Sequence, residues 1–275
     1  LHFQKILQYA IILLGFGMNL FEIFRVGSQS LLIIISTIGT ALVVSYAVSR
    51  IMKIDHDIAT LVGVGSSICG GSAIAAAAPV IKASDEDIAQ SISVIFLFNV
   101  IAAFLFPTLG AILGFNDMGF GMWAGTAIND TSSVVAAGQT WASASGSDTA
   151  LNYATIVKLT RTLAIIPICL GLAYLTSKRK ATTSEVKISS IFPMFIIYFL
   201  GASIINTFAG SHFDFFQFLP AIGKFMIAMA MAAIGLNTNL VKLIKTGGKP
   251  ILLGLICWFC IAVVSLAMQH LLNIW

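Results

Sequence analysis

The chain has 275 residues, of which 58% are hydrophobic and only 9% are charged. Soluble domains carry about 25% charged residues, so a chain of this composition cannot be solvated as a globule and is expected in a membrane. The formal net charge of +4 lies mainly on lysines and arginines between apolar segments. There it indicates orientation in a membrane rather than binding to nucleic acid.

Nine apolar segments are long enough to cross a bilayer, which takes roughly 20 helical residues. They cover residues 4–24, 31–49, 58–81, 88–114, 119–140, 150–175, 188–209, 216–237 and 250–273. The only long polar connection is residues 176–187, so we expect one all-α polytopic membrane domain over residues 1–275. The uneven number of segments and the start without Met or a signal peptide suggest further N-terminal helices in the full-length protein.

The basic residues predict how the chain is oriented. If each segment crosses once, alternate connections lie on the same side of the membrane. One set holds Arg50, Lys53, Lys178, Arg179, Lys180, Lys187, Lys242, Lys245 and Lys249, and the other holds only Arg25 and Lys82. Basic connections tend to stay in the cytoplasm, so we expect the first set inside and the C-terminus outside.

Two internal similarities indicate a repeated architecture. Residues 14–27 (LGFGMNLFEIFRVG) align with residues 234–247 (IGLNTNLVKLIKTG), with Asn19 matching Asn239. These copies run in opposite directions across the membrane, as inverted repeats of transporters do. They make Asn19, Asn237 and Asn239 secondary candidates for a site, although each could equally cap a helix or bond across helices.

The second similarity joins residues 65–77 (GSSICGGSAIAAA) to residues 125–137 (GTAINDTSSVVAA). Counting segments makes these two parallel rather than inverted. A re-entrant segment, a permuted repeat and a chance match of low-complexity sequence are the alternatives.

Both similar stretches place glycines and hydroxyls where a plain membrane anchor would place Leu, Ile and Val. Backbone that loosens at membrane depth is tolerated only where protein buries it or water reaches it. A broken helix also presents free N–H groups and a positive dipole end, which bind anions. Close packing of small residues is the competing explanation. The candidate substrate-binding residues are Ser66, Ser67, Cys69, Gly70, Thr126, Asn129, Thr131 and Ser132.

Asp130 lies near the middle of an apolar segment, where a carboxylate costs roughly 2.5–3.5 kcal/mol on insertion scales. Lys158 and Arg161 are its obvious cationic partners, because they lie one turn apart on one helix face. The three could form a structural salt bridge. Alternatively, Asp130 could bind a coupling proton or cation, or Lys158 and Arg161 could bind an anionic substrate.

Motifs for other chemistry are missing from the sequence. It contains no P-loop, no metal-ligand cluster and no nucleophile elbow. Its four cysteines lie in apolar segments, where those other than Cys69 are expected as small buried hydrophobes. We therefore expect no enzymatic activity, no metal and no cofactor.

Four ordered motifs carry a resemblance to a known family: GVGSSICGGSAIAAAAPVIKAS, GTAINDTSSVVAAG, VKLTRTLAIIP and MAMAAIGLNTN. Together they resemble the YeiH-like sulfate exporter family of bacterial inner-membrane proteins over essentially the whole chain. The resemblance implies about eleven spans and kinship with cation/proton antiporter and anion transporter folds, which contain broken helices. Many relatives carry a His where this chain has Asn129, followed by an acid matching Asp130.

These observations predict a secondary transporter of a small anion, sulfate or an organic sulfonate, in the bacterial cytoplasmic membrane. Lys158 and Arg161 would supply positive charge and Asp130 would couple transport to H⁺ or Na⁺. The alternatives are a sodium- or proton-coupled antiporter that uses Asp130, and a non-transporting membrane scaffold. The expected partners are the substrate, the lipid bilayer and a second copy in a homodimer, with no nucleic acid.

Overall fold

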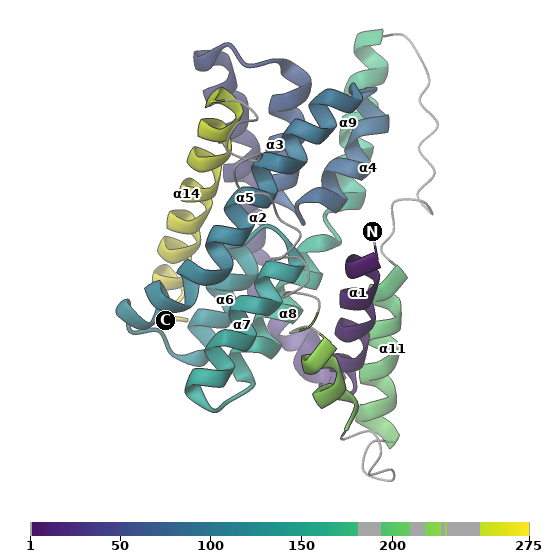
Figure 1. Ribbon diagram of the computed structural model, residues 1–275, viewed down its shortest axis with the longest axis vertical. Coiled ribbons are helices and arrows are strands. Elements are labelled where there is room, and N and C mark those ends of the chain that lie inside the picture. The colour runs from purple at the N-terminus through teal and green to yellow at the C-terminus, as the bar shows by residue number, and fades with distance from the viewer. Residues whose placement is uncertain (1, 181–193, 210–217, 227–228, 230–247, 275) are drawn as a thin grey trace.

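The computed structural model describes residues 2–180, 194–209, 218–226, 229 and 248–274. Among these residues the secondary structure is helical, with no strand, and the helices form one bundle (Figure 1). The prediction of an all-α membrane fold is confirmed. The repeat copy at 234–247, with Asn237 and Asn239, lies outside the described residues.

The helices follow one another in chain order and differ greatly in length. They are α1 (His2–Gly15), α2 (Leu20–Met52), α3 (His56–Ser67), α4 (Gly71–Ile81), α5 (Asp85–Ile112), α6 (Asp117–Ala127), α7 (Thr131–Ser145), α8 (Thr149–Thr162), α9 (Ile165–Lys180), α11 (Met194–Ala209) and α14 (Gly248–Leu271). Four stretches of the described chain are long and apolar enough to cross a bilayer: α2, α5, α8 continued by α9, and α14.

The boundary between the first two predicted segments was wrong. The sequence pattern placed it at residues 25–30, whereas α1 ends at Gly15 and α2 begins at Leu20. Asn19 starts α2 by accepting a hydrogen bond from the Phe21 amide at 2.9 Å. Ser28 and Ser30 do not break the helix, because their hydroxyls donate to backbone carbonyls one turn earlier. Arg25 therefore lies within α2 and not in a connection.

Residues 58–81 do not cross the membrane, contrary to the segment count. The carboxylates of Asp55 and Asp57, at the start of α3, and of Asp87, at the start of α5, all lie within 4.8 Å of one another. The chain therefore enters along α3, reverses at residues 68–70 and returns along α4. Lys82 consequently lies at the same end of the molecule as Arg50, which corrects its predicted place on the opposite side.

A second hairpin, α6 and α7, enters from the other end. Trp141 Nε1 in α7 donates to Asp117 Oδ1 at the start of α6, at 2.7 Å, so this chain segment also returns to its starting side. Figure 1 shows α3 and α4 in the upper half of the bundle and α6 and α7 in the lower half. The similar segments 65–77 and 125–137 are therefore inverted, and the parallel arrangement obtained by counting is wrong.

The helix formed by α8 and α9 passes both hairpins and is held closely against the second one. A Cβ atom added at Gly121 of α6 would lie 2.6 Å from the Tyr153 Cβ of α8, and one at Gly125 would lie 2.8 Å from the Val157 Cβ. Glycines four residues apart allow this close approach. The contact fixes the polar end of α8 beside the end of α6.

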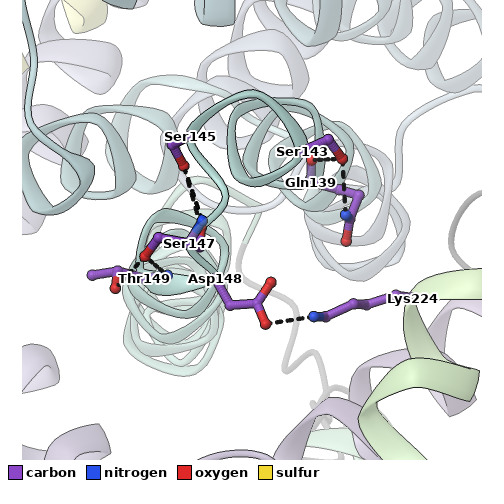
Figure 2. Close-up of polar contacts among 7 residues, drawn as sticks. All are labelled: Gln139, Ser143, Ser145, Ser147, Asp148, Thr149 and Lys224. Carbon is purple, nitrogen blue, oxygen red and sulfur yellow. Dashed lines mark hydrogen bonds and ion pairs between the residues drawn. The ribbon is translucent and has the colours of Figure 1, made fainter.

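An ion pair joins the start of α8 to a helical segment that follows α11 in the sequence. Figure 2 shows Asp148, whose Oδ2 accepts from Lys224 Nζ at 2.5 Å. Beside it, the Ser147 hydroxyl donates to Thr149 Oγ1 at 2.9 Å. Because both charged side chains are partly exposed, the pair contributes about 0–1 kcal/mol to stability.

Candidate functional site

The two hairpins meet tip to tip inside the bundle. We call residues 68–70 the first tip and residues 128–130 the second tip, and the region where they meet the crossing. A Cβ atom added at Gly70 would lie 3.4 Å from the Asp130 Cβ. Gly70 has φ +71° and ψ −128°, a conformation that residues with a side chain rarely adopt, so glycine permits the reversal there.

Lys158 binds both tips at once. Its Nζ donates to the Ile68 carbonyl at 2.7 Å and to the Ile128 carbonyl at 3.0 Å. These carbonyls follow the C-terminal ends of α3 and α6, where the helix dipoles are negative and carbonyls lack intrahelical partners. The lysine is fully buried, so its ammonium group obtains its hydrogen bonds and charge compensation from the ends of the two half-helices.

Arg161, one turn further along α8, also binds carbonyls at the ends of both α3 and α6, and it uses three nitrogen atoms to do so. Its Nε donates to the Ser67 carbonyl at 2.8 Å, Nη2 to the Ser66 carbonyl at 2.6 Å, and Nη1 to the Thr126 carbonyl. No water is available in a bilayer core to pair such carbonyls. A buried guanidinium with a planar set of donors therefore stabilises both broken helices.

Asp130 does not pair with either cation, so the salt bridge that was one of the alternatives for these three residues is not formed. Its Oδ2 accepts from the Ser132 amide at 3.0 Å and from the Ser133 amide at 3.4 Å, so it caps the N-terminus of α7. No ion pair involving Asp130 occurs among the described residues. Lys158 and Arg161 are already occupied by the carbonyls, and the carboxylate is satisfied by the amides at a positive helix end.

Asn99 of α5 belongs to the crossing, although the sequence did not single it out. Its Oδ1 accepts from the amides of Asn129 at 3.2 Å and of Asp130 at 3.1 Å, and its side chain is buried. A lone amide in the apolar middle of a predicted span was the available signal. The repeated motif drew attention to other asparagines instead.

Three polar features of the crossing are not engaged. Both side-chain polar atoms of Asn129 and the hydroxyl of Ser66 are buried without a hydrogen-bond partner. The N-terminus of α4 has no side-chain cap, because glycine occupies the capping position. Buried polar groups are usually paired, so these unsatisfied groups distinguish the crossing from ordinary helix packing.

The remaining predicted residues divide between the crossing and other places. The Thr126 hydroxyl lies 2.6 Å from the Ser265 hydroxyl of α14, and the Ser67 hydroxyl donates to the Val64 carbonyl. Cys69 is a buried free thiol at the first tip, while Thr131 and Ser132 begin α7. Asn19 caps α2 and does not join the crossing.

One group of described acidic residues is close enough to share a cation. It consists of Asp55, Asp57 and Asp87 at the starts of α3 and α5, with Asp55 exposed and the other two half-buried. This group lies at one end of the bundle rather than at the crossing. The crossing itself offers amide, hydroxyl and carbonyl groups around two cations and one carboxylate, a set suited to holding an ion or small polar molecule.

Comparison with known proteins places the chain in a family. The family model described as "Conserved hypothetical protein 698" matches residues 1–254. The chain belongs to this family. It is similar to a UPF0324 membrane protein of Streptococcus pyogenes serotype M3, with 58% identity over 278 residues that cover 99% of this chain and 82% of that protein.

Other relatives of this conserved hypothetical family carry the same name. A UPF0324 membrane protein of Fusobacterium nucleatum is 54% identical over 286 residues, covering 98% of this chain and 83% of that protein. One from Streptococcus mutans is 57% identical over 280 residues, covering 99% and 82%. No solved structure matches the chain significantly. Together with the apolar spans, these relatives identify a bacterial multi-pass membrane protein, and their names state no substrate.

Proposed function

We propose that the protein is a secondary transporter of a small anion, sulfate or an organic sulfonate, and not an enzyme. The substrate would bind at the crossing, near the middle of the membrane. The observation that carries the proposal is the pair of re-entrant hairpins, which enter from opposite ends and meet at unsatisfied polar groups. Broken helices that meet near the midplane are how several transporter folds hold substrate.

The charges at the crossing favour an anion. Lys158 and Arg161 are both fully buried, while Asp130 is the carboxylate at the two tips. With all three ionised, the side chains carry two positive charges and one negative charge, a net charge of +1. The two negative and two positive helix ends largely cancel one another. An anion bound at the crossing would neutralise this excess charge.

The donors available to an anion lie at and beside both tips. The N-terminus of α7 is already capped by the Asp130 carboxylate, whereas that of α4 has no side-chain cap. Ser66, just before the first tip, and Asn129, in the second tip, carry unpartnered polar atoms. In this arrangement Lys158 and Arg161 hold the tips and contribute charge at short range, while the amides and uncharged side chains would contact the anion.

Substitution of the unpartnered groups tests this proposal. Ser66→Ala and Asn129→Ala remove side chains that make no hydrogen bonds, so the fold should be retained while anion flux falls at least tenfold. The measurement is uptake of radiolabelled sulfate and taurine by proteoliposomes that contain the full-length protein. The matched control is Ser91→Ala on α5, whose hydroxyl is also buried and unpartnered but lies outside the crossing.

Three results would contradict the proposal. They are wild-type flux in both crossing variants, an equal loss in the Ser91→Ala control, and no anion flux by the wild-type protein. The last result would favour a scaffold without transport activity.

A cation-coupled antiporter is the second candidate, because the Asp130 carboxylate is not neutralised by a direct ion pair among the described residues. Asp130→Asn separates the two functions cleanly. Asparagine caps a helix about as well as aspartate, so the variant should fold. Loss of pH or sodium dependence with anion binding retained supports coupling by Asp130 in an anion transporter. Cation flux that needs no anion supports the antiporter instead.

A further inference from the structure

A cavity of about 550 Å³ opens at the end of the molecule that carries Arg50 and Lys53. Its walls are α2 from Leu42 to Arg50, α3 from His56 to Val64 and α9 from Ile168 to Thr176. Each wall spans nine residues, or about 12 Å of helix, compared with roughly 15 Å for half of a bilayer core. The cavity therefore extends from this end to within about one turn of the first tip.

The deep walls of the cavity present carbon rather than polar groups. Leu42, Ile168 and Leu172 line it directly. The Ser45 hydroxyl donates to the Ala59 carbonyl at 2.6 Å, and Ser49 donates to the Tyr46 carbonyl at 2.8 Å. These lining hydroxyls are therefore already engaged. Thr60 and Thr176 are the other Ser or Thr residues of the lining, so a bare inorganic ion would exchange its hydration for few hydrogen bonds here, which is costly.

Arg50 places a positive charge at the mouth of the cavity, and the carboxylates of Asp55, Asp57 and Asp87 lie at the same end without lining the cavity. Arg50 is exposed there and its guanidinium carbon lies 5.2 Å from the centre of the Tyr46 ring, which holds it in place. His56 also lines the mouth, and its Nδ1 lies 3.4 Å from Asp57 Oδ1. Among the described lining residues, Arg50 is the one Lys or Arg side chain. No Asp or Glu is among the described lining residues. A guanidinium group can donate two parallel hydrogen bonds to two oxygens of one anionic group, such as a carboxylate or a phosphate.

We propose that this cavity binds an amphiphilic organic anion, with its charged head at Arg50 and its apolar body between α2, α3 and α9. The volume lies within the range of about 300–1,000 Å³ that is typical of small-molecule sites. The binding site itself is argued from the cavity, and only its role in transport rests on the proposed function. It deepens that function by favouring an organic sulfonate with an apolar body over sulfate.

A chain-length series measures the apolar contribution directly. The full-length protein in phosphatidylcholine nanodiscs is titrated calorimetrically with sulfate, methanesulfonate, butanesulfonate and hexanesulfonate, and empty nanodiscs supply the background. Affinity should rise about fourfold per buried methylene, with sulfate binding weakest. Equal affinities along the series would overturn the proposal.

Two pairs of variants locate the site. Gly171→Leu on α9 should fill the cavity, because a Cβ atom there has no neighbour within 4 Å. Gly39→Leu on α2 is the matched control, since a Cβ at Gly39 is equally free and Gly39 does not line the cavity. Gly171→Leu should weaken hexanesulfonate binding at least tenfold and Gly39→Leu should leave it unchanged.

The charge is tested in the same way. Arg50→Gln should weaken binding about tenfold, while Lys53→Gln, at the same end but not in the lining, should not. An equal effect within either pair would overturn the assignment. Displacement of hexanesulfonate by phosphatidylglycerol in mixed nanodiscs would also overturn it, because the occupant would then be a membrane lipid.

The failure of this inference can be distinguished from failure of the proposed function. Anion flux with no effect of Gly171→Leu on binding contradicts the cavity site alone. Hexanesulfonate binding that depends on Gly171 and Arg50, in a protein without anion flux, supports the cavity site and contradicts the transport proposal.

Discussion

Arg161 donates hydrogen bonds to three carbonyls that belong to two different half-helices. Lys158 adds a bond to each tip. The sequence presented these residues as partners of a carboxylate or as an anion clamp. Their contacts make them the residues that hold two broken helices together at membrane depth.

Replacing Arg161 should therefore affect stability strongly. Arg161→Met keeps much of the apolar stem and leaves the carbonyls of Ser66, Ser67 and Thr126 without their donor, which should lower the free energy of unfolding by about 3–5 kcal/mol. Arg161→Lys should recover part of this loss. The measurement is denaturant unfolding of the purified protein in mixed micelles, followed by tryptophan fluorescence.

Arg25→Met is the control for the Arg161 series. Arg25 is an exposed residue of α2, so its replacement should change stability by less than about 0.5 kcal/mol. Similar losses for Arg25→Met and Arg161→Met would show that the tips do not depend on the guanidinium.

At the scale of elements, the packing of α6 on α8 decides where the two cations lie. Gly125 lies against Val157, one residue before Lys158. Any side chain at position 125 would separate the helices and move Lys158 and Arg161 away from the second tip. The sequence left close helix packing as an alternative explanation for the small residues. In the structure, the close packing at Gly125 also positions Lys158 and Arg161.

Gly125→Ala tests this dependence. The added Cβ would lie 2.8 Å from Val157 side-chain atoms and 2.9 Å from the Ala154 carbonyl oxygen, which is too close for any adjustment without backbone movement. We expect a loss of about 1–3 kcal/mol and a lower melting temperature in thermal-shift measurements. Gly39→Ala, which meets nothing within 4 Å, should be neutral or slightly stabilising. Unchanged melting of Gly125→Ala would contradict the close α6–α8 contact.

At the scale of the whole molecule, the two hairpins change the topology. Two of the predicted crossings are re-entrant, so the chain returns to the same side before α5 and again before α8. The basic residues Arg50, Lys53 and Lys82 then gather at one end, as the tendency of basic residues to stay in the cytoplasm favours. The segment count had placed Lys82 on the opposite side, so the topology of the structure agrees better with this tendency.

Cysteine labelling tests this topology in the full-length protein. Single cysteines at Lys53, Lys82 and Asn116 are introduced into a variant without native cysteines, and a membrane-impermeant maleimide is applied to right-side-out and inverted vesicles. Lys53→Cys and Lys82→Cys should react from the same side, and Asn116→Cys from the other. Labelling of the first two from opposite sides would mean that residues 58–81 cross the membrane.

By itself, the sequence determined the class of the protein and the location of its unusual backbone. Low charge and long apolar runs require a bilayer because so much carbon cannot be solvated. Glycines and hydroxyls at 63–72 and 125–133 marked both breaks, since a helix in lipid keeps its regular bonds unless such residues interrupt it. The inverted relation of residues 14–27 to residues 234–247 remains a prediction.

Only the tertiary structure decided the direction of each segment and the partners of each charge. Hydropathy records the length of an apolar run but not whether the chain turns back inside it, and that turn depends on the backbone at Gly70 and at the second tip. The partners of Lys158 and Arg161 are backbone carbonyls, which every residue possesses and no sequence pattern marks. Their availability follows from where α3 and α6 end and from how closely α8 packs beside them.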